Sequence, residues 1–262
     1  MKQNQLYILL LLLMLTQVVS CGLFRTKESH DDFKKQYSQD SRRDFWEHWK
    51  VLGKDFKENY KTKLKRPPEF VQNYLQKILM NIEKRNEVFF ENDPKTNLSF
   101  LVFEDQRPFY FSLPSGEIIL SRKLIEKYID HEGALTAILV PEYVRIRKVI
   151  YPKVKKIPLG YLELDRMLSM QRLPFDQRLK LHQWSYYLIS RSNYNPGQYL
   201  SWLQLQNRNH LDFSFYLADS ILLVKEEAYL KQFIIQNYGK LELNPLNLKS
   251  SKEFYNFIEV YR

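Results

Sequence analysis

The chain contains a single cysteine, Cys21, so no disulfide can form within it and the fold must rest on a packed core. Its 262 residues are 44% hydrophobic and 15% aromatic, which suits one sizeable globular domain and excludes general disorder. Only seven glycines are present, so a glycine-rich phosphate loop is not expected. The sequence therefore predicts a fold held together by the packing of helices and strands alone.

The residues before Cys21 have the pattern of a secretory signal. Lys2 is followed by an apolar run from Leu6 to Thr16, too short to span a bilayer stably, and then by Val18-Val-Ser-Cys21. These last four residues resemble the lipobox of bacterial lipoproteins, in which a signal peptidase cuts before a lipid-carrying cysteine. An ordinary or uncleaved signal beside a stray cysteine is the alternative.

This resemblance implies that residues 1–20 are removed and that Cys21 carries acyl chains, palmitate included, which anchor the protein to a membrane of the cell envelope. Gly22 stands where many inner-membrane lipoproteins have aspartate, so the resemblance also implies the outer membrane, facing the periplasm, if the host is Gram-negative. The formal net charge is +10. For a protein in the envelope, we expect the counter-surface to be anionic lipid headgroups or other polyanions and not nucleic acid.

Four segments are expected after the signal. Residues 21–43 are polar and predict a flexible tether, residues 44–68 an amphipathic helical segment, residues 69–206 the main domain, and residues 207–262 a C-terminal helical extension. In residues 44–64, apolar side chains recur at helical spacing, namely Phe45, Trp49, Leu52 and Phe56. This stripe is expected to pack on the domain; the alternative is that it lies on the membrane.

The main domain reads as α+β, mainly helical with a small antiparallel or mixed sheet. Residues 69–87 have helical spacing, with apolar side chains four apart at Phe70, Tyr74, Ile78 and Ile82. Strands are expected at 98–103, 109–113 and 117–120, helices at 121–126 and 132–150, and mostly helix from 161 onwards.

Several stretches of this domain resemble the zinc metallopeptidases of the CAAX prenyl protease, HtpX and BepA type. The matching runs are Phe109-Tyr-Phe-Ser-Leu-Pro-Ser-Gly116, then Glu132-Gly-Ala-Leu-Thr-Ala-Ile-Leu-Val-Pro-Glu-Tyr-Val-Arg145, and later Ser185 to Pro196. The likeness covers about residues 69–206 and implies a zincin-like domain.

The departures from the family fall on its metal ligands. Zincins bind zinc through two histidines four residues apart, with a glutamate between them as general base. These histidines correspond to Pro141 and Arg145 here, and only Glu142 remains. The third ligand, a glutamate, corresponds to Arg178 (with His182 at the family's aspartate) or to Tyr161 (with Asp165 at that aspartate). Neither is a carboxylate, so the resemblance implies a pseudo-metallopeptidase with no metal and no cofactor.

The five histidines, at positions 30, 48, 131, 182 and 210, show no spacing typical of a metal site. Within helix 132–150, Glu142 and Arg145 are three residues apart on an otherwise apolar stripe, so they can reach each other. We expect them to form an ion pair in the place of the metal; the alternative is that both reach solvent in a residual cleft. Pro141, in the middle of the helix, removes a hydrogen bond or bends the helix, at a cost of about 3 kcal/mol.

The functions that remain open are three. The resemblance implies binding of a protein or peptide partner as an added strand along 109–113 or 117–120, with Tyr110, Phe111 and Ile118 as the candidate edge. Plain core packing is the simpler expectation for these strands. The other two candidates are an active hydrolase with a non-standard site and a purely structural lipoprotein.

Overall fold

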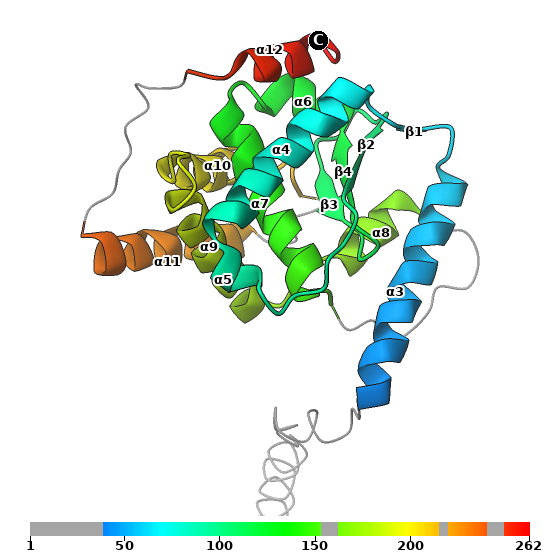
Figure 1. Ribbon diagram of the computed structural model, residues 1–262, viewed down its shortest axis with the longest axis horizontal. Coiled ribbons are helices and arrows are strands. Elements are labelled where there is room, and N and C mark those ends of the chain that lie inside the picture. The colour runs from blue at the N-terminus through cyan, green and yellow to red at the C-terminus, as the bar shows by residue number, and fades with distance from the viewer. Residues whose placement is uncertain (1–38, 153–161, 215–219, 240–248) are drawn as a thin grey trace, which may run out of the picture. The chain divides into compact units, whose positions relative to one another are not determined.

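A computed structural model describes residues 39–152, 162–214, 220–239 and 249–262 (Figure 1). The expected signal and Cys21 lie outside the described residues. The helices are α3 (Gln39–Asn59), α4 (Glu69–Arg85), α5 (Glu87–Phe90), α6 (Arg122–Tyr128), α7 (Glu132–Lys148), α8 (Leu164–Met170), α9 (Phe175–Ser190), α10 (Gly197–Arg208), α11 (Ser220–Tyr238) and α12 (Lys252–Glu259). The strands are β1 (Leu64–Lys65), β2 (Ser99–Phe103), β3 (Tyr110–Ser112) and β4 (Glu117–Ser121). The expected class, mainly helical α+β with a small sheet, is confirmed.

The sheet has the strand order β1-β2-β4-β3 and is mixed. Strands β2 and β4 run parallel, with Ser99 opposite Glu117, whereas β1–β2 and β3–β4 are antiparallel pairs. Because β4 has a partner on each side, residues 117–120 cannot provide a free edge, and that part of the expected edge is wrong. The outer strands are β1 and β3.

Helix α7 lies at the centre of the fold, in contact with α4, α9, α10 and the sheet (Figure 1). Every residue from Ala134 to Arg147 is buried, so the single apolar stripe expected here is instead a helix enclosed on all sides. A helix whose whole circumference is covered has no solvent-exposed face for its charges. The charged side chains of α7 must therefore find partners inside the protein.

Two features of α7 depart from an ideal helix. Pro141 lies within it, and the helix continues through that residue to Lys148, two residues before the expected end. Val149 then adopts a left-handed conformation with φ of 55°, which is strained for a β-branched residue. Arg145 stabilises this turn through two hydrogen bonds with Ile150. The Arg145 backbone carbonyl accepts from the Ile150 N–H at 2.9 Å, and the Arg145 side-chain Nε donates to the Ile150 carbonyl at 3.4 Å.

Helix α3 packs its aromatic stripe inward. Trp49, Leu52 and Phe56 are 0%, 4% and 0% exposed, and the Trp49 indole N–H donates to the Pro152 carbonyl at 3.0 Å. The packing alternative is therefore correct for these residues, and the membrane alternative is wrong for them. The helix begins at Gln39, before the expected start at 44, so the last residues assigned to the tether are helical. Residues 46–262 form one compact unit.

Two local expectations about α3 and α4 are wrong. Residues 60–65 leave the helix and form a turn followed by β1, because pairing with β2 outweighs the local helical pattern. Phe70 is 51% exposed, although Tyr74, Ile78 and Ile82 are buried. Residues four apart advance about 40° around a helix at each step, so Phe70 is rotated roughly 120° from Ile82 and leaves the core face. Among the described helices, none is both long and apolar enough to cross a bilayer.

Candidate functional site

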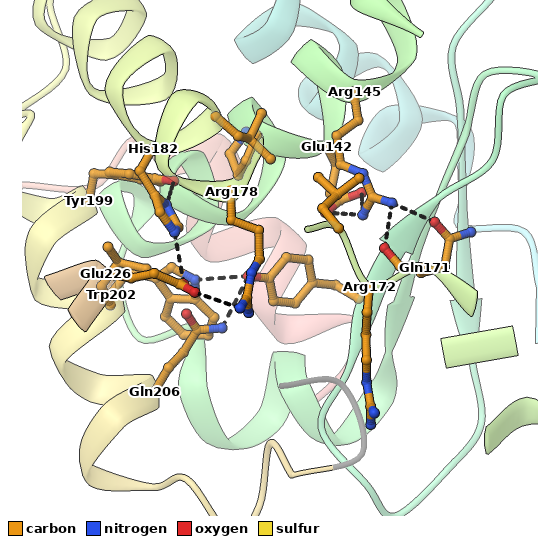
Figure 2. A pocket seen from close by; sticks show the side chains of 15 residues that line it. Glu142, Arg145, Gln171, Arg172, Arg178, His182, Tyr199, Trp202, Gln206 and Glu226 are labelled. Carbon is orange, nitrogen blue, oxygen red and sulfur yellow. Dashed lines mark hydrogen bonds and ion pairs between the residues drawn. The ribbon is translucent and has the colours of Figure 1, made fainter. Parts of the chain in front are cut away.

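A small cavity of about 60 Å³ lies between α7, α9, α10, α11, the segment after α8 and the start of β3 (Figure 2). Its volume is enough for a few water molecules. Pro141, Glu142 and Arg145 line it from α7, and Arg178 and His182 line it from α9. The structure thus brings to one place Pro141, Glu142, Arg145 and Arg178, the positions at which the resemblance would put the two histidines, the glutamate base and one of the two candidate third ligands. The other candidate, Tyr161, lies outside the described residues.

Glu142 and Arg145 are in direct contact in this cavity. The Arg145 Nη1 lies 3.2 Å from a Glu142 carboxylate oxygen, and each side chain is 2% exposed. The Arg145 Nη2 donates to the backbone carbonyl of Gln171 at 3.0 Å and to its side-chain Oε1 at 2.6 Å. The expectation that both charges reach solvent is therefore wrong, because both are buried and the guanidinium is bonded on two sides.

Gln171 links Arg145 to the sheet. Its side-chain Nε2 donates to the Ser112 carbonyl at 3.2 Å (Figure 2 shows its amide facing Arg145). The residues on either side of β3, Phe109 and Leu113, form backbone hydrogen bonds with Ser121 and Glu117 of β4. Because antiparallel bonding alternates along a strand, the backbone groups of Tyr110 and Ser112 face the outer edge. Gln171 thus occupies one acceptor of that edge.

The expected edge side chains are core residues. Tyr110, Phe111 and Ile118 are 5%, 0% and 0% exposed, so they cannot serve as side-chain platforms for a partner. Tyr110 is fixed further, since its hydroxyl accepts hydrogen bonds from Trp202 Nε1 at 3.3 Å and Gln206 Nε2 at 3.1 Å. The simpler expectation, core packing, is correct for these three side chains.

A second charged cluster occupies the other side of the cavity. The Glu226 carboxylate, 2% exposed, lies 3.0 Å from Arg178 Nη2 and 3.0 Å from His182 Nε2. The other ring nitrogen of His182, Nδ1, lies 2.8 Å from the Tyr199 hydroxyl. Figure 2 shows Arg178 and His182 both pointing toward Glu226. Glu226 comes from α11, so the C-terminal extension completes a cavity that was assigned to residues 69–206 alone.

The row from Glu226 through His182 to Tyr199 has the order of an acid, a base and a hydroxyl, but its geometry does not suit nucleophilic catalysis. Tyr199 is 1% exposed, and burial raises the pKa of its hydroxyl well above the ordinary value. A nucleophile must be reachable by substrate and easily deprotonated, and this hydroxyl is neither. The cluster is therefore best described as a buried, internally bonded network.

The side chains present do not fit a zinc ion. Zinc is bound by imidazole, thiolate or carboxylate groups, whereas Pro141 offers no donor and Arg145 and Arg178 present cations. The two carboxylates of the cavity, Glu142 and Glu226, are each paired with one of these arginines. Across the residues that the structure describes, no group of three or more His, Cys, Asp or Glu side chains is placed to hold a metal.

Asp165, the aspartate of the second register, lies on α8 and away from this cavity. Its side chain is 54% exposed and pairs with Arg107.

Two residues of the cavity, Gln171 and Glu226, were not predicted from the sequence, since no motif marks a glutamine after α8 or a glutamate within the apolar helix α11. The chain matches no protein-family model, and no curated protein is similar to it in sequence.

Proposed function

We propose that this chain is a lipid-anchored protein of the bacterial cell envelope whose main domain has the scaffold of the CAAX protease, HtpX and BepA type of metallopeptidase. In this proposal the domain has no catalytic role and binds a protein or peptide partner. The attachment rests on the sequence around Cys21, which resembles a lipobox.

One observation carries the scaffold part of the proposal. The resemblance assigns positions 141 and 145 on α7, and in one of its two registers position 178 on α9, to metal ligands, and all three line the same cavity although the two helices are separated in the sequence by α8. Their convergence supports the resemblance. Their identities, proline and two arginines that neutralise Glu142 and Glu226, support the absence of metal chemistry.

The binding part of the proposal is supported by the position of β3. It is an outer strand with outward-facing backbone groups at Tyr110 and Ser112; Tyr110 lines the cavity, and the Ser112 carbonyl bonds Gln171, which lines it too. An extended peptide can add to such an edge through backbone hydrogen bonds, which need no metal. Because Gln171 already bonds the Ser112 carbonyl, a bound strand must displace this amide, which makes Gln171 the residue that competes with the partner.

The scaffold is tested by restoring the metal ligands. The triple variant Pro141→His, Arg145→His and Arg178→Glu places two imidazoles and a carboxylate around the cavity, with Glu142 between the imidazoles. We expect it to bind one zinc ion per chain by atomic absorption, while the original chain binds none and cleaves no casein. The matched control is the variant Pro141→Ala, Arg145→His and Arg178→Gln, which lacks two of the ligands.

A triple variant that folds by circular dichroism but binds no more zinc than its control contradicts the proposed scaffold. Stoichiometric zinc in the original chain, or casein cleavage that a chelator abolishes, contradicts the non-catalytic role and favours the hydrolase.

Partner binding is tested by photocrosslinking in the native envelope. A crosslinking amino acid at exposed Ser115, in the turn that joins β3 to β4, is expected to form a discrete adduct that the same group at exposed Asn92 does not form. Replacing Gln171 by Ala should increase this adduct, since the edge acceptor is then free. If Ser115 yields no adduct in either background, the purely structural alternative holds.

The anchor has a separate test. Labelled palmitate should be incorporated into the original chain and not into the Cys21→Ser variant. Incorporation into both variants, or into neither, contradicts acylation at Cys21.

A further inference from the structure

The turn between α3 and α4 carries a dense group of positive charges. We name residues 61–66 the basic turn; it contains Lys61, Lys63, Lys65 and Arg66, all of them exposed, and includes the outer strand β1. No acidic residue lies within this stretch. Four cations over six residues form the kind of surface that attracts polyanions.

Most of these cations have no acidic partner in the described part of the chain. Lys61, Lys65 and Arg66 take part in none of its ion pairs, whereas some other surface cations, such as Arg122 and Lys127, are paired with carboxylates. Arg122, for example, lies 3.6 Å from Glu104 and 2.8 Å from Glu126. The charge of the basic turn is therefore available to an external partner.

An apolar side chain adjoins the basic turn. Phe70, in the first turn of α4, is 51% exposed, and Pro68 before it is also exposed. Cations beside an exposed aromatic ring match the two layers of a bilayer surface, since the cations face the headgroups and the ring enters the boundary with the acyl chains. Protein interfaces also use aromatic side chains; the bilayer is the favoured partner here because the proposed anchor at Cys21 keeps it close to the domain.

We propose that the basic turn and Phe70 dock the domain onto a bilayer surface that contains anionic phospholipid. This inference rests on the membrane attachment proposed above. The 17 residues from 22 to 38 reach at most about 56 Å when fully extended, whereas α3 is roughly 32 Å long, so an anchor at Cys21 permits the C-terminal end of α3 to meet the same membrane. Each cation contributes about a fivefold factor to such docking.

The test uses the full chain reconstituted into vesicles and the acetylation rates of its lysines, measured by mass spectrometry. In vesicles with one part phosphatidylglycerol to two parts phosphatidylcholine, Lys61, Lys63 and Lys65 should react at least about fivefold more slowly than in phosphatidylcholine alone. The protection should disappear in 0.5 M salt. The internal controls are Lys84, Lys180 and Lys252, which are exposed on other elements and should react equally in both vesicles.

A matched pair of variants separates the basic turn from net charge. Replacing Lys61, Lys65 and Arg66 by Gln should abolish the protection of Lys63, whereas replacing Lys84, Lys180 and Lys252 by Gln removes as much charge and should preserve it. Replacing Phe70 by Ser should weaken the protection and leave its salt dependence unchanged.

Equal acetylation rates of Lys61, Lys63 and Lys65 in the two kinds of vesicle overturn the proposal. The cations then serve to keep the outer strand β1 from pairing with other chains. Protection that appears in native envelopes but not in the anionic vesicles also overturns it, in favour of an acidic protein. If the proposed lipid attachment at Cys21 is wrong, the chain does not float with phosphatidylcholine vesicles. This result is distinct from a failure of the basic turn to dock.

Discussion

At the scale of single residues, Arg145 combines two roles that the sequence indicates only in part. Its spacing from Glu142 predicted their contact, and the structure has that contact at 3.2 Å. Its bonds to Gln171 were not predictable, since Gln171 is 26 residues away and is brought near only by the path of the chain after α7. Pairing with neighbours three or four residues away is a property of the helix, whereas the outer partners of a buried charge depend on tertiary packing.

Replacing Arg145 by Ala should destabilise the fold by about 3–5 kcal/mol, because Glu142 is then buried without its counter-ion. The measurement is the urea midpoint with its slope. The double variant Glu142→Gln and Arg145→Met removes both charges and should recover much of this loss. The control, Arg191→Ala, changes an exposed arginine and should leave the midpoint close to that of the original chain. An unchanged midpoint for Arg145→Ala would show that the pair contributes little.

His131 should make stability depend on pH near neutrality. Burial by itself lowers the pKa of this imidazole, but the hydrogen bond and negative charge of Asp130 outweigh it, so the pKa is raised above its ordinary value. The other ring nitrogen lies 2.5 Å from Gln198 Oε1, so the doubly protonated ring donates to two acceptors. Because the pKa of His131 is higher in the folded than in the unfolded chain, the protonated ring stabilises the fold fully below about pH 6.5. This stabilisation is lost as the pH rises through the pKa of the folded state.

We therefore expect the free energy of unfolding to fall between pH 6 and 9 by more in the original chain than in a His131→Gln variant, measured by chemical denaturation across that range. Parallel curves for the two proteins would contradict the assignment.

At the scale of elements, most of the helices and three strands were predictable, because apolar periodicity is a local property of the sequence. The errors have physical causes. Strand β1 forms because it pairs with β2, and the sequence of residues 60–65 has no strand pattern from which this pairing could be predicted. Helix α7 was expected to bury one stripe, but it is enclosed on all sides because α10 and α4 cover its remaining faces.

Glu132 fastens α12 to the start of α7. Its carboxylate accepts hydrogen bonds from the Tyr74 hydroxyl at 2.7 Å, the Ser251 N–H at 3.1 Å and the Ser251 hydroxyl at 2.8 Å. Replacing Glu132 by Ala should lower stability by about 2 kcal/mol and make α12 more sensitive to limited proteolysis. Glu253→Ala is the control, since that side chain forms a solvent-exposed pair with Lys77. Equal proteolysis of the two variants would mean that apolar packing alone holds α12.

At the scale of the whole molecule, the sequence predicted the class of fold, and it left two positions open, Arg178 and Tyr161, for the residue expected to face Glu142 and Arg145. It did not predict which other elements enclose the cavity. Glu226 lies 44 residues beyond His182 on a helix with no distinguishing motif, so its approach to Arg178 depends on the complete fold. The boundary expected at residue 206 consequently divides the cavity lining, because α11 contributes Glu226 and also buries Leu223, Leu230 and Ile234.

A chain truncated after residue 214 should therefore not unfold cooperatively, since the loss of α11 and α12 uncovers core side chains and leaves Arg178 without its carboxylate. Thermal unfolding followed by circular dichroism measures this. A full chain with exposed Val224 replaced by Ser serves as the control and should retain a sharp transition. A truncated chain with the same transition would show that the part of the chain before residue 215 folds without α11 and α12.

The connection from Glu142 through Arg145 and Gln171 to Ser112 makes changes at these positions interdependent. A substitution that removes the arginine leaves a carboxylate uncompensated and at the same time loosens the amide that covers the end of β3. A stepwise replacement of these residues is therefore expected to produce variants that fold poorly before all the residues have changed. The arrangement is expected to resist stepwise mutational drift even where no activity is under selection.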